Sequence, residues 1–185
     1  MKDRKYITEE EFKLLINGRV KTKRESKKRF LRYHAILSLL YYHGLRRLEL
    51  CELKWANINL SMKSPNIFVN RAKNGKSGTH PLVRGEYPLL CDLKDLSVGG
   101  KYVIENPLGG KIASGTIDKF FRTINKNKIL PMHIHPHMLR HGCGHYMAEK
   151  GIDTRRIQDY LGHSSIASTV LYTTLSGKKF VGLWS

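Results

Sequence analysis

The spacing of apolar residues in the first third of the chain predicts three helices. Thr8 and Glu11 have the form of a capping box, and the apolar residues at 12–16 then favour a short helix. Apolar residues at 30–42 have the spacing of a buried helix, and a further helix is predicted at 46–55. This part of the chain is therefore expected to be entirely helical.

The pattern then changes to short runs of residues that favour β-strands. These runs lie at 58–60, 67–69 and 79–82. The last two are separated by a segment that contains Asn74 and Gly75, a dipeptide strongly favoured in hairpin turns. We predict a small three-stranded antiparallel sheet.

A helical pattern returns in the remaining residues. Helices are predicted near 85–93 and at 116–124, and Pro136 is suited to the first turn of a helix that runs to position 150. Asp153 can cap the next helix, and a final helix holds Tyr172. The expected fold class is mainly α with a small three-stranded antiparallel β-sheet, an α+β fold.

The length of the chain predicts a single domain. Its 185 residues are enough for one full hydrophobic core and too few for two. We treat 1–185 as one unit, with 173–185 as a C-terminal tail.

The charge of the chain points to a polyanionic partner. Lys and Arg number 33 against 15 Asp and Glu, which gives a net charge of +18 and a pI near 10.0. Such an excess attracts phosphate backbones, and the segment 19–29, rich in Lys and Arg, is either a solvated linker or a strip that lies against phosphates. A membrane is the competing polyanion, but the longest apolar run, 35–42, is far below the ~20 residues of a membrane span. We therefore expect nucleic acid as the partner and no membrane association.

The cysteines and the opening residues indicate a reducing compartment. The three cysteines are an odd number and show no CxxC spacing, which argues against a disulfide framework and a thiol zinc site. The first twelve residues are charged throughout and do not form a secretory leader. A cytoplasmic location is expected.

The densest polar cluster lies at 133–145, where five histidines and one cysteine occur within thirteen residues. A metal site is one interpretation, although no recognised zinc spacing is present. His137 and Arg140 are three residues apart, so on a helix they share one face and can converge on a phosphate. Gly142 and Gly144 cost a helix about 1 kcal/mol each, which indicates close packing there.

Four ordered segments resemble the motifs of the tyrosine recombinases, the phage integrase family. GLRRLEL at 44–50 resembles the first arginine box, and AKNGK at 72–76 resembles the segment with the β-hairpin lysine. HMLRH at 137–141 is similar to the HxLRH box, and LGH at 161–163, followed nine residues after its histidine by Tyr172, is similar to the final segment. Four motifs in the right order are far more specific than any one of them.

Three further segments are similar to the short recombinases that invert the promoter switch of fimbrial operons. They lie at 134–141, 151–155 and 157–163. Those proteins lack the usual N-terminal core-binding domain, so the resemblance implies a catalytic domain alone. It also implies a bacterial cytoplasmic protein that associates with the nucleoid.

The resemblance implies a site of six residues and a role for each. Two arginines grip the scissile phosphate, one histidine adds a hydrogen bond to it, and the tyrosine is the nucleophile that forms a 3′-phosphotyrosyl link. The lysine is the general acid for the leaving 5′-oxygen, and the second histidine takes the tyrosine proton. In this order the residues are Arg46 and Arg140, His163, Tyr172, Lys73, and His137.

Several residues offer alternatives to these assignments. Lys76 competes with Lys73 for the lysine role, and Tyr160 and Tyr146 compete with Tyr172. His141 is interpreted as packing or hydrogen-bonding support, Glu49 as orienting a helix or a basic neighbour, and His80 has no assigned role.

The resemblance also implies the partners and excludes a cofactor. The expected partner is double-stranded DNA with inverted-repeat sites. The chain is expected to be a monomer or weak oligomer when free and a homotetramer on DNA, where the tail at 173–185 either docks into a neighbouring subunit or folds back on its own core. Host DNA-bending proteins are possible further partners, and neither metal nor ATP is required. Three alternative functions stay open: nicking and resealing like a type IB topoisomerase, DNA-binding regulation without catalysis, and a histidine-rich metal protein.

Overall fold

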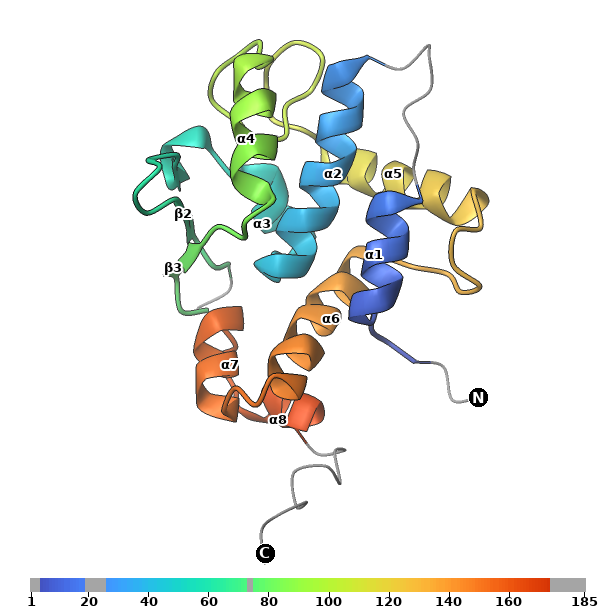
Figure 1. The fold of residues 1–185 in the computed structure, drawn as a ribbon, viewed down its shortest axis with the longest axis vertical. Coiled ribbons are helices and arrows are strands. Elements are labelled where there is room, and N and C mark those ends of the chain that lie inside the picture. The colour runs from blue at the N-terminus through green and yellow to red at the C-terminus, as the bar shows by residue number, and fades with distance from the viewer. Residues whose placement is uncertain (1–3, 19–25, 73–74, 174–185) are drawn as a thin grey trace, which may run out of the picture.

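The structure is a computed structural model, which describes residues 4–18, 26–72 and 75–173 (Figure 1). Within these ranges helices predominate and the strands are short. The elements are α1 (Glu9–Asn17), α2 (Lys27–Tyr42), α3 (Arg47–Glu52), η1 (Trp55–Asn57), β1 (Ile58–Asn59), β2 (Asn66–Val69), β3 (Gly78–Pro81), α4 (Glu86–Asp95), α5 (Ser114–Lys126), α6 (Pro136–Glu149), α7 (Thr154–Leu161) and α8 (Ala167–Thr173).

Helix α2 forms the centre of the molecule, and this explains its nearly continuous apolar sequence. Every residue from Ala35 to Tyr41 is buried. Helix α4 packs on one side of α2 and α6 on another, as Figure 1 shows. A helix covered on most sides has no polar stripe, so burial of apolar area stabilises it all round.

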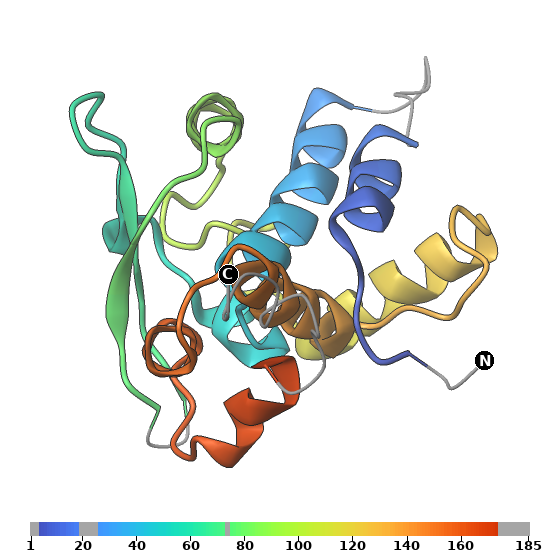
Figure 2. The same cartoon turned by 60° about the horizontal axis from the view of Figure 1, so that its bottom comes forward.

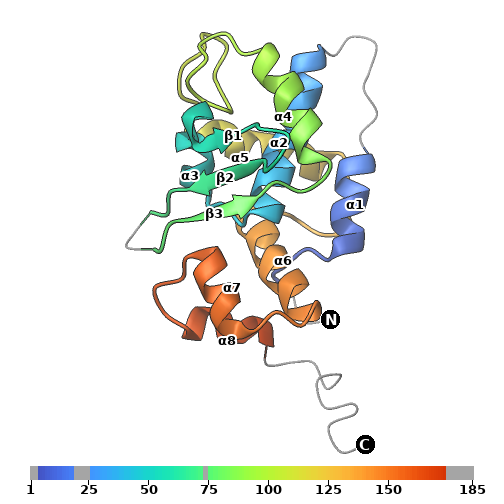
Figure 3. The ribbon, with the colours of Figure 1, turned by 60° about the vertical axis from the view of Figure 1, so that its left-hand side comes forward.

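The three strands form an antiparallel sheet in the order β1-β2-β3, as predicted. In β2 and β3 Asn66 pairs with Pro81 and Val69 with Gly78, so the regular ladder ends well before the Asn-Gly dipeptide. Figure 3 shows β3 at the edge of the sheet closest to α7. The sheet thus meets the C-terminal helices through β3.

Helices α6, α7 and α8 form the end of the molecule that carries the last predicted motifs. Figure 2, which brings this end forward, shows α7 beside the sheet and α8 beside α6. Pro136 is in the first turn of α6, Asp153 caps α7 by accepting a hydrogen bond from the backbone N–H of Arg156, and Gly162 ends α7 with φ +64°. These local signals confirm the helices predicted here.

Helices α2 and α3 differ most clearly in extent from the sequence prediction. Helix α2 begins at Lys27, where Ser26 is the N-cap, rather than at position 30. Helix α3 ends at Glu52 instead of continuing to position 55, because the backbone of Leu53 accepts a hydrogen bond from Val103 N at 3.0 Å. This pairing with a distant segment draws the chain out of the helix. In the described ranges, no helix is long and apolar enough to cross a membrane.

Candidate active site

The turn between α2 and α3 positions the first predicted arginine. Gly44 has φ +55°, and a Cβ atom there would lie 2.5 Å from Cδ2 of Leu161, so both conformation and packing favour glycine. Arg46 follows as the N-cap of α3, with its side chain 26% exposed. The guanidinium is thus held at a helix terminus while still accessible to a ligand.

The carboxylate of Glu49 organises this turn. It accepts hydrogen bonds from the Arg46 backbone N–H at 2.8 Å, from Arg46 Nη1 at 2.7 Å, from Arg71 Nη1 at 3.0 Å and from the Ala72 N–H at 3.1 Å. Burial raises the pKa of Glu49, but the hydrogen bonds with Arg46 and the charge of Arg71 outweigh it and leave the pKa below the ordinary value. Glu49 therefore stays ionised and orients two arginines, more than the single basic neighbour that the sequence indicated.

Arg140 reaches the same turn from α6. Its guanidinium is buried; Nη1 donates to the carbonyl of Gly44 and Nη2 to the carbonyl of Leu161 at 2.7 Å. Burial, followed by the charges of Arg71 and Arg46, lowers its pKa to about 10. Arg140 is therefore still a cation at neutral pH, fixed between the turn before α3 and the end of α7.

The predicted nucleophile is enclosed by α6 and the segment after α7. Tyr172 is 6% exposed, and its hydroxyl lies 2.8 Å from Nδ1 of His141. Burial raises its pKa to about 12, so the hydroxyl keeps its proton at neutral pH and needs a base to become a nucleophile.

His163 lies next to this tyrosine. The two rings are stacked with centroids 6.2 Å apart, and His163 Nδ1 contacts Thr169 Oγ1 at 2.9 Å. Burial, followed by the charge of Arg140, lowers the pKa of His163 to about 4, so the ring is neutral at neutral pH. A neutral imidazole held through Nδ1 can present Nε2 to a phosphate oxygen.

His137 lies on the same open surface as Arg46. It is exposed in the first turn of α6 and lines an open hollow of about 480 Å³ together with Arg46, Arg47, His135 and others. The histidine that contacts the Tyr172 hydroxyl is His141, one helical turn later.

Two of the competing residues have partners that involve α7. Lys73, like the tail beyond position 173, lies outside the described residues. Lys76 pairs with Asp159 at 3.2 Å, and the Tyr160 hydroxyl donates to the carbonyl of Tyr42 at 2.9 Å. Burial also raises the pKa of Tyr160. The first contact joins the segment before β3 to α7, and the second joins α7 to the end of α2. These structural contacts make Lys76 and Tyr160 weaker candidates for catalysis.

His80 received no role from the sequence, and the structure supplies one. Its buried ring stacks on Tyr160 with centroids 3.7 Å apart, and burial lowers its pKa to about 3. The neutral ring packs β3 against α7. The described parts of the chain bring no three His, Cys, Asp or Glu side chains together in a way that could hold a metal ion.

Comparison with known proteins identifies the family of the chain. The model of the phage integrase family matches residues 5–179. The chain belongs to this family. It is 37% identical over 158 residues to the type 1 fimbriae regulatory protein FimB of Escherichia coli K12. The matched segment covers 83% of this chain and 78% of FimB.

Solved recombinase structures share the fold. A crystal structure of XerA recombinase superposes with a TM-score of 0.75 at 28% identity and covers 97% of this chain. XerH site-specific recombinase bound to its difH substrate gives a TM-score of 0.75 at 20% identity over 98% of this chain. The chain spans 61% of the XerA chain and 53% of the XerH chain. The α+β fold of a tyrosine recombinase catalytic domain is thereby established.

Substituting Gly144 tests the packing of the tyrosine. A Cβ atom at this position would lie 2.6 to 2.8 Å from atoms of the Tyr172 ring. We expect Gly144→Ala to displace the ring and to slow covalent attachment to DNA about tenfold, because overpacking costs about 1–3 kcal/mol.

The control for this substitution is Gly115→Ala in α5, where an added Cβ has no neighbour within 4 Å. Alanine should only improve helix propensity there. Rates of attachment and thermal unfolding of both variants are the measurements, and equal rates would show that the ring does not need its present position.

Proposed function

We propose that this chain cuts and rejoins double-stranded DNA through a 3′-phosphotyrosyl link to Tyr172. One observation carries the proposal: Arg46 and Arg140 are both anchored at the turn around Gly44, and Arg140 also binds the carbonyl of Leu161, directly before the segment of His163. Phosphoryl transfer needs stabilisation of charge and in-line positioning more than any other help. Two fixed guanidinium groups provide both.

In the proposed reaction the oxygen of Tyr172 attacks phosphorus and the bond to the 5′-oxygen breaks. The tyrosine proton passes to a neutral histidine, first to His141 in the geometry described, with His137 as the assignment that the family motif implies. The leaving 5′-oxygen takes its proton from Lys73. A 5′-hydroxyl then attacks the phosphotyrosine, which retains the energy of the broken bond, and the strands are rejoined.

The substrate proposed is DNA with inverted-repeat sites, on which four copies of the chain assemble. The charge of +18 supports a polyanionic partner, and XerH, which shares the fold, has been crystallised with its DNA substrate. The similarity to FimB supports inversion of a DNA segment that controls fimbriae, with host DNA-bending proteins as further partners.

A recombination assay tests this function against its alternatives. The protein is incubated with a supercoiled plasmid that carries two inverted sites from a fimbrial-type promoter switch. Inversion of the intervening segment is the expected result. Relaxation without inversion would favour an activity like that of a type IB topoisomerase, and binding without either would favour a silent regulator.

DNA affinity should fall steeply as salt rises. Lys and Arg along 19–29 are expected to displace condensed counterions, and each neutralised phosphate contributes about −0.9 to the slope of log affinity against log salt. Replacing two lysines, Lys21 and Lys23, should flatten the slope by about 2 and weaken binding to all sequences alike. Fluorescence anisotropy at several salt concentrations is the measurement, and a loss confined to one DNA sequence would mean that these lysines read bases.

A further inference from the structure

A third arginine, Arg71, lies beside the candidate site but has no part in the reaction as proposed. It follows β2 and directly precedes the segment that resembles the hairpin-lysine motif. Its side chain is 0% exposed, so it is enclosed by protein rather than presented to DNA. A fully buried guanidinium next to an active site requires an explanation, because burying a charge costs several kcal/mol unless it is paired.

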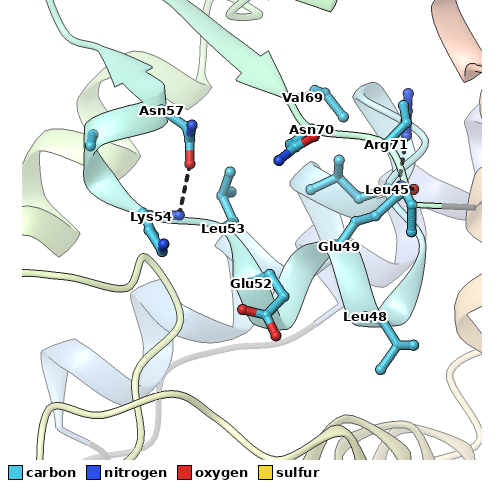
Figure 4. A pocket seen from close by; sticks show the side chains of 12 residues that line it. Leu45, Leu48, Glu49, Glu52, Leu53, Lys54, Asn57, Val69, Asn70 and Arg71 are labelled. Atoms are coloured by element: carbon cyan, nitrogen blue, oxygen red, sulfur yellow. Dashed lines mark hydrogen bonds and ion pairs between the residues drawn. The ribbon is translucent and has the colours of Figure 1, made fainter. Parts of the chain in front are cut away.

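Both terminal nitrogens of Arg71 are used within the protein. Nη1 donates to the carbonyl of Gly44 at 3.1 Å and to Oε2 of Glu49 at 3.0 Å. Nη2 donates to the carbonyls of His43 at 2.9 Å and Tyr160 at 2.7 Å. Figure 4 shows Arg71 turned toward Glu49 at one end of the pocket between α3 and β2. These four acceptors use all four terminal N–H groups of Arg71, whereas Arg140 uses only two of its own. Arg71 therefore has no terminal N–H group left for a phosphate.

The contacts of Arg71 lead to the residues expected to touch the phosphate. Glu49 is its ion-pair partner, and the same carboxylate binds both the backbone and the guanidinium of Arg46. The Gly44 carbonyl accepts from Arg71 and also from Arg140. Arg71 therefore holds both the carboxylate that orients Arg46 and the carbonyl that binds Arg140.

A third connection runs toward the end of α7. A Cβ atom at Gly162 would lie 2.6 Å from Cγ of Arg71, so the turn that precedes His163 rests on the aliphatic part of this side chain. Tyr160, whose carbonyl accepts from Arg71, lies in the last turn of the same helix. One buried side chain thus connects the α2–α3 turn, the segment after β2 and the end of α7.

We propose that Arg71 is a positioning residue, which fixes the Arg46 guanidinium against the scissile phosphate by holding Glu49 and the carbonyl of Gly44. This inference rests on the proposed function. Misplacing a group by about 1 Å in an active site can cost about a hundredfold in rate, so a residue without any contact to the substrate can still govern cleavage. The rival explanation is an ion pair that contributes only to the stability of the fold.

The test compares Arg71→Gln and Arg71→Lys with the wild type. The rate of covalent attachment to a nicked duplex is measured under single-turnover conditions, and the duplex is one that the wild-type protein has been shown to bind. We expect Arg71→Gln to slow attachment roughly ten- to a hundredfold while DNA affinity changes little. Arg71→Lys keeps the charge that pairs with Glu49 and should recover part of the rate. Arg155→Gln is the matched control, since Arg155 is exposed and 3.9 Å from its partner Asp159.

Two readouts separate positioning from stability. In the Arg46→Ala background, Arg71→Gln should cost clearly less than in the wild type, because the part of its effect that passes through Glu49 to Arg46 has already been lost. On a duplex with a neutral methylphosphonate at the scissile position, the penalty of Arg71→Gln should shrink, because the negative charge that Arg46 stabilises has been removed. Thermal unfolding of every variant is recorded alongside.

Several results would overturn the inference. An effect that multiplies with Arg46→Ala, or that is equal on both substrates, would assign Arg71 to the fold alone. Loss of folding and of DNA binding in both Arg71 variants would do the same. Wild-type rates in both variants would remove any role. If the wild type itself forms no attachment, the proposed function fails and this inference fails with it.

Discussion

Tyr172→Phe is expected to abolish covalent attachment to DNA and to leave folding and DNA binding nearly intact. The two side chains differ by one hydroxyl, so the ring that packs on Gly144 is retained and only the nucleophile and its contact with His141 are lost. Loss of that single hydrogen bond should lower the free energy of unfolding by about 0.5–1.5 kcal/mol. A complete loss of chemistry with so small a loss of stability identifies a nucleophile.

The measurement uses a nicked duplex that traps the intermediate after cleavage. The reaction contains EDTA, and the products are denatured in detergent before separation. Wild type should give a protein–DNA adduct that protease reduces to a peptide linked through Tyr172.

Tyr160→Phe is the matched control. It also loses one buried hydrogen bond, from its hydroxyl to the carbonyl of Tyr42, yet it should form the adduct normally. An adduct that persists in Tyr172→Phe and disappears in Tyr160→Phe would transfer the nucleophile to α7 and break the alignment of the final motif.

The second large effect is expected from Arg140→Ala. Loss of one transition-state donor typically costs about 10²- to 10³-fold in rate, and we expect cleavage to fall by that amount. The structure adds a cost that the sequence did not reveal: the carbonyls of Gly44 and Leu161 each lose a donor. The free energy of unfolding should therefore also fall, by about 1–3 kcal/mol for the Leu161 carbonyl, whereas the Gly44 carbonyl keeps its hydrogen bond from Arg71.

Single-turnover cleavage and chemical unfolding measure the two effects separately. Arg140→Lys is the informative companion, because it keeps a cation but cannot reproduce the two-nitrogen fork. We expect it to bind DNA like the wild type and to cleave far more slowly. Cleavage by Arg140→Ala at a rate close to wild type would show that this arginine serves only to join α6 to the turn before α3.

The ends of most elements were determined by the sequence itself. Local signals act within one helical turn and can therefore be predicted from the order of residues. Examples are the capping box of Thr8 and Glu11, the proline at 136 and the glycine at 162. The end of α3 could not be predicted from the sequence, because the segment after Glu52 pairs with residues about fifty positions later. A contact of that range leaves no local pattern.

The sequence also determined which residues are candidates for catalysis. The order and spacing of the four motifs led to Arg46, Arg140, His163 and Tyr172. Only the tertiary structure decided how they are supported. Arg71 belongs to a basic chain with 33 lysines and arginines, and nothing in its neighbours marks it as buried. Its role depends on carbonyls and a carboxylate that the fold brings to it from two distant segments, 43–49 and the end of α7. His141 rather than His137 contacts Tyr172 because of how α6 and α8 pack.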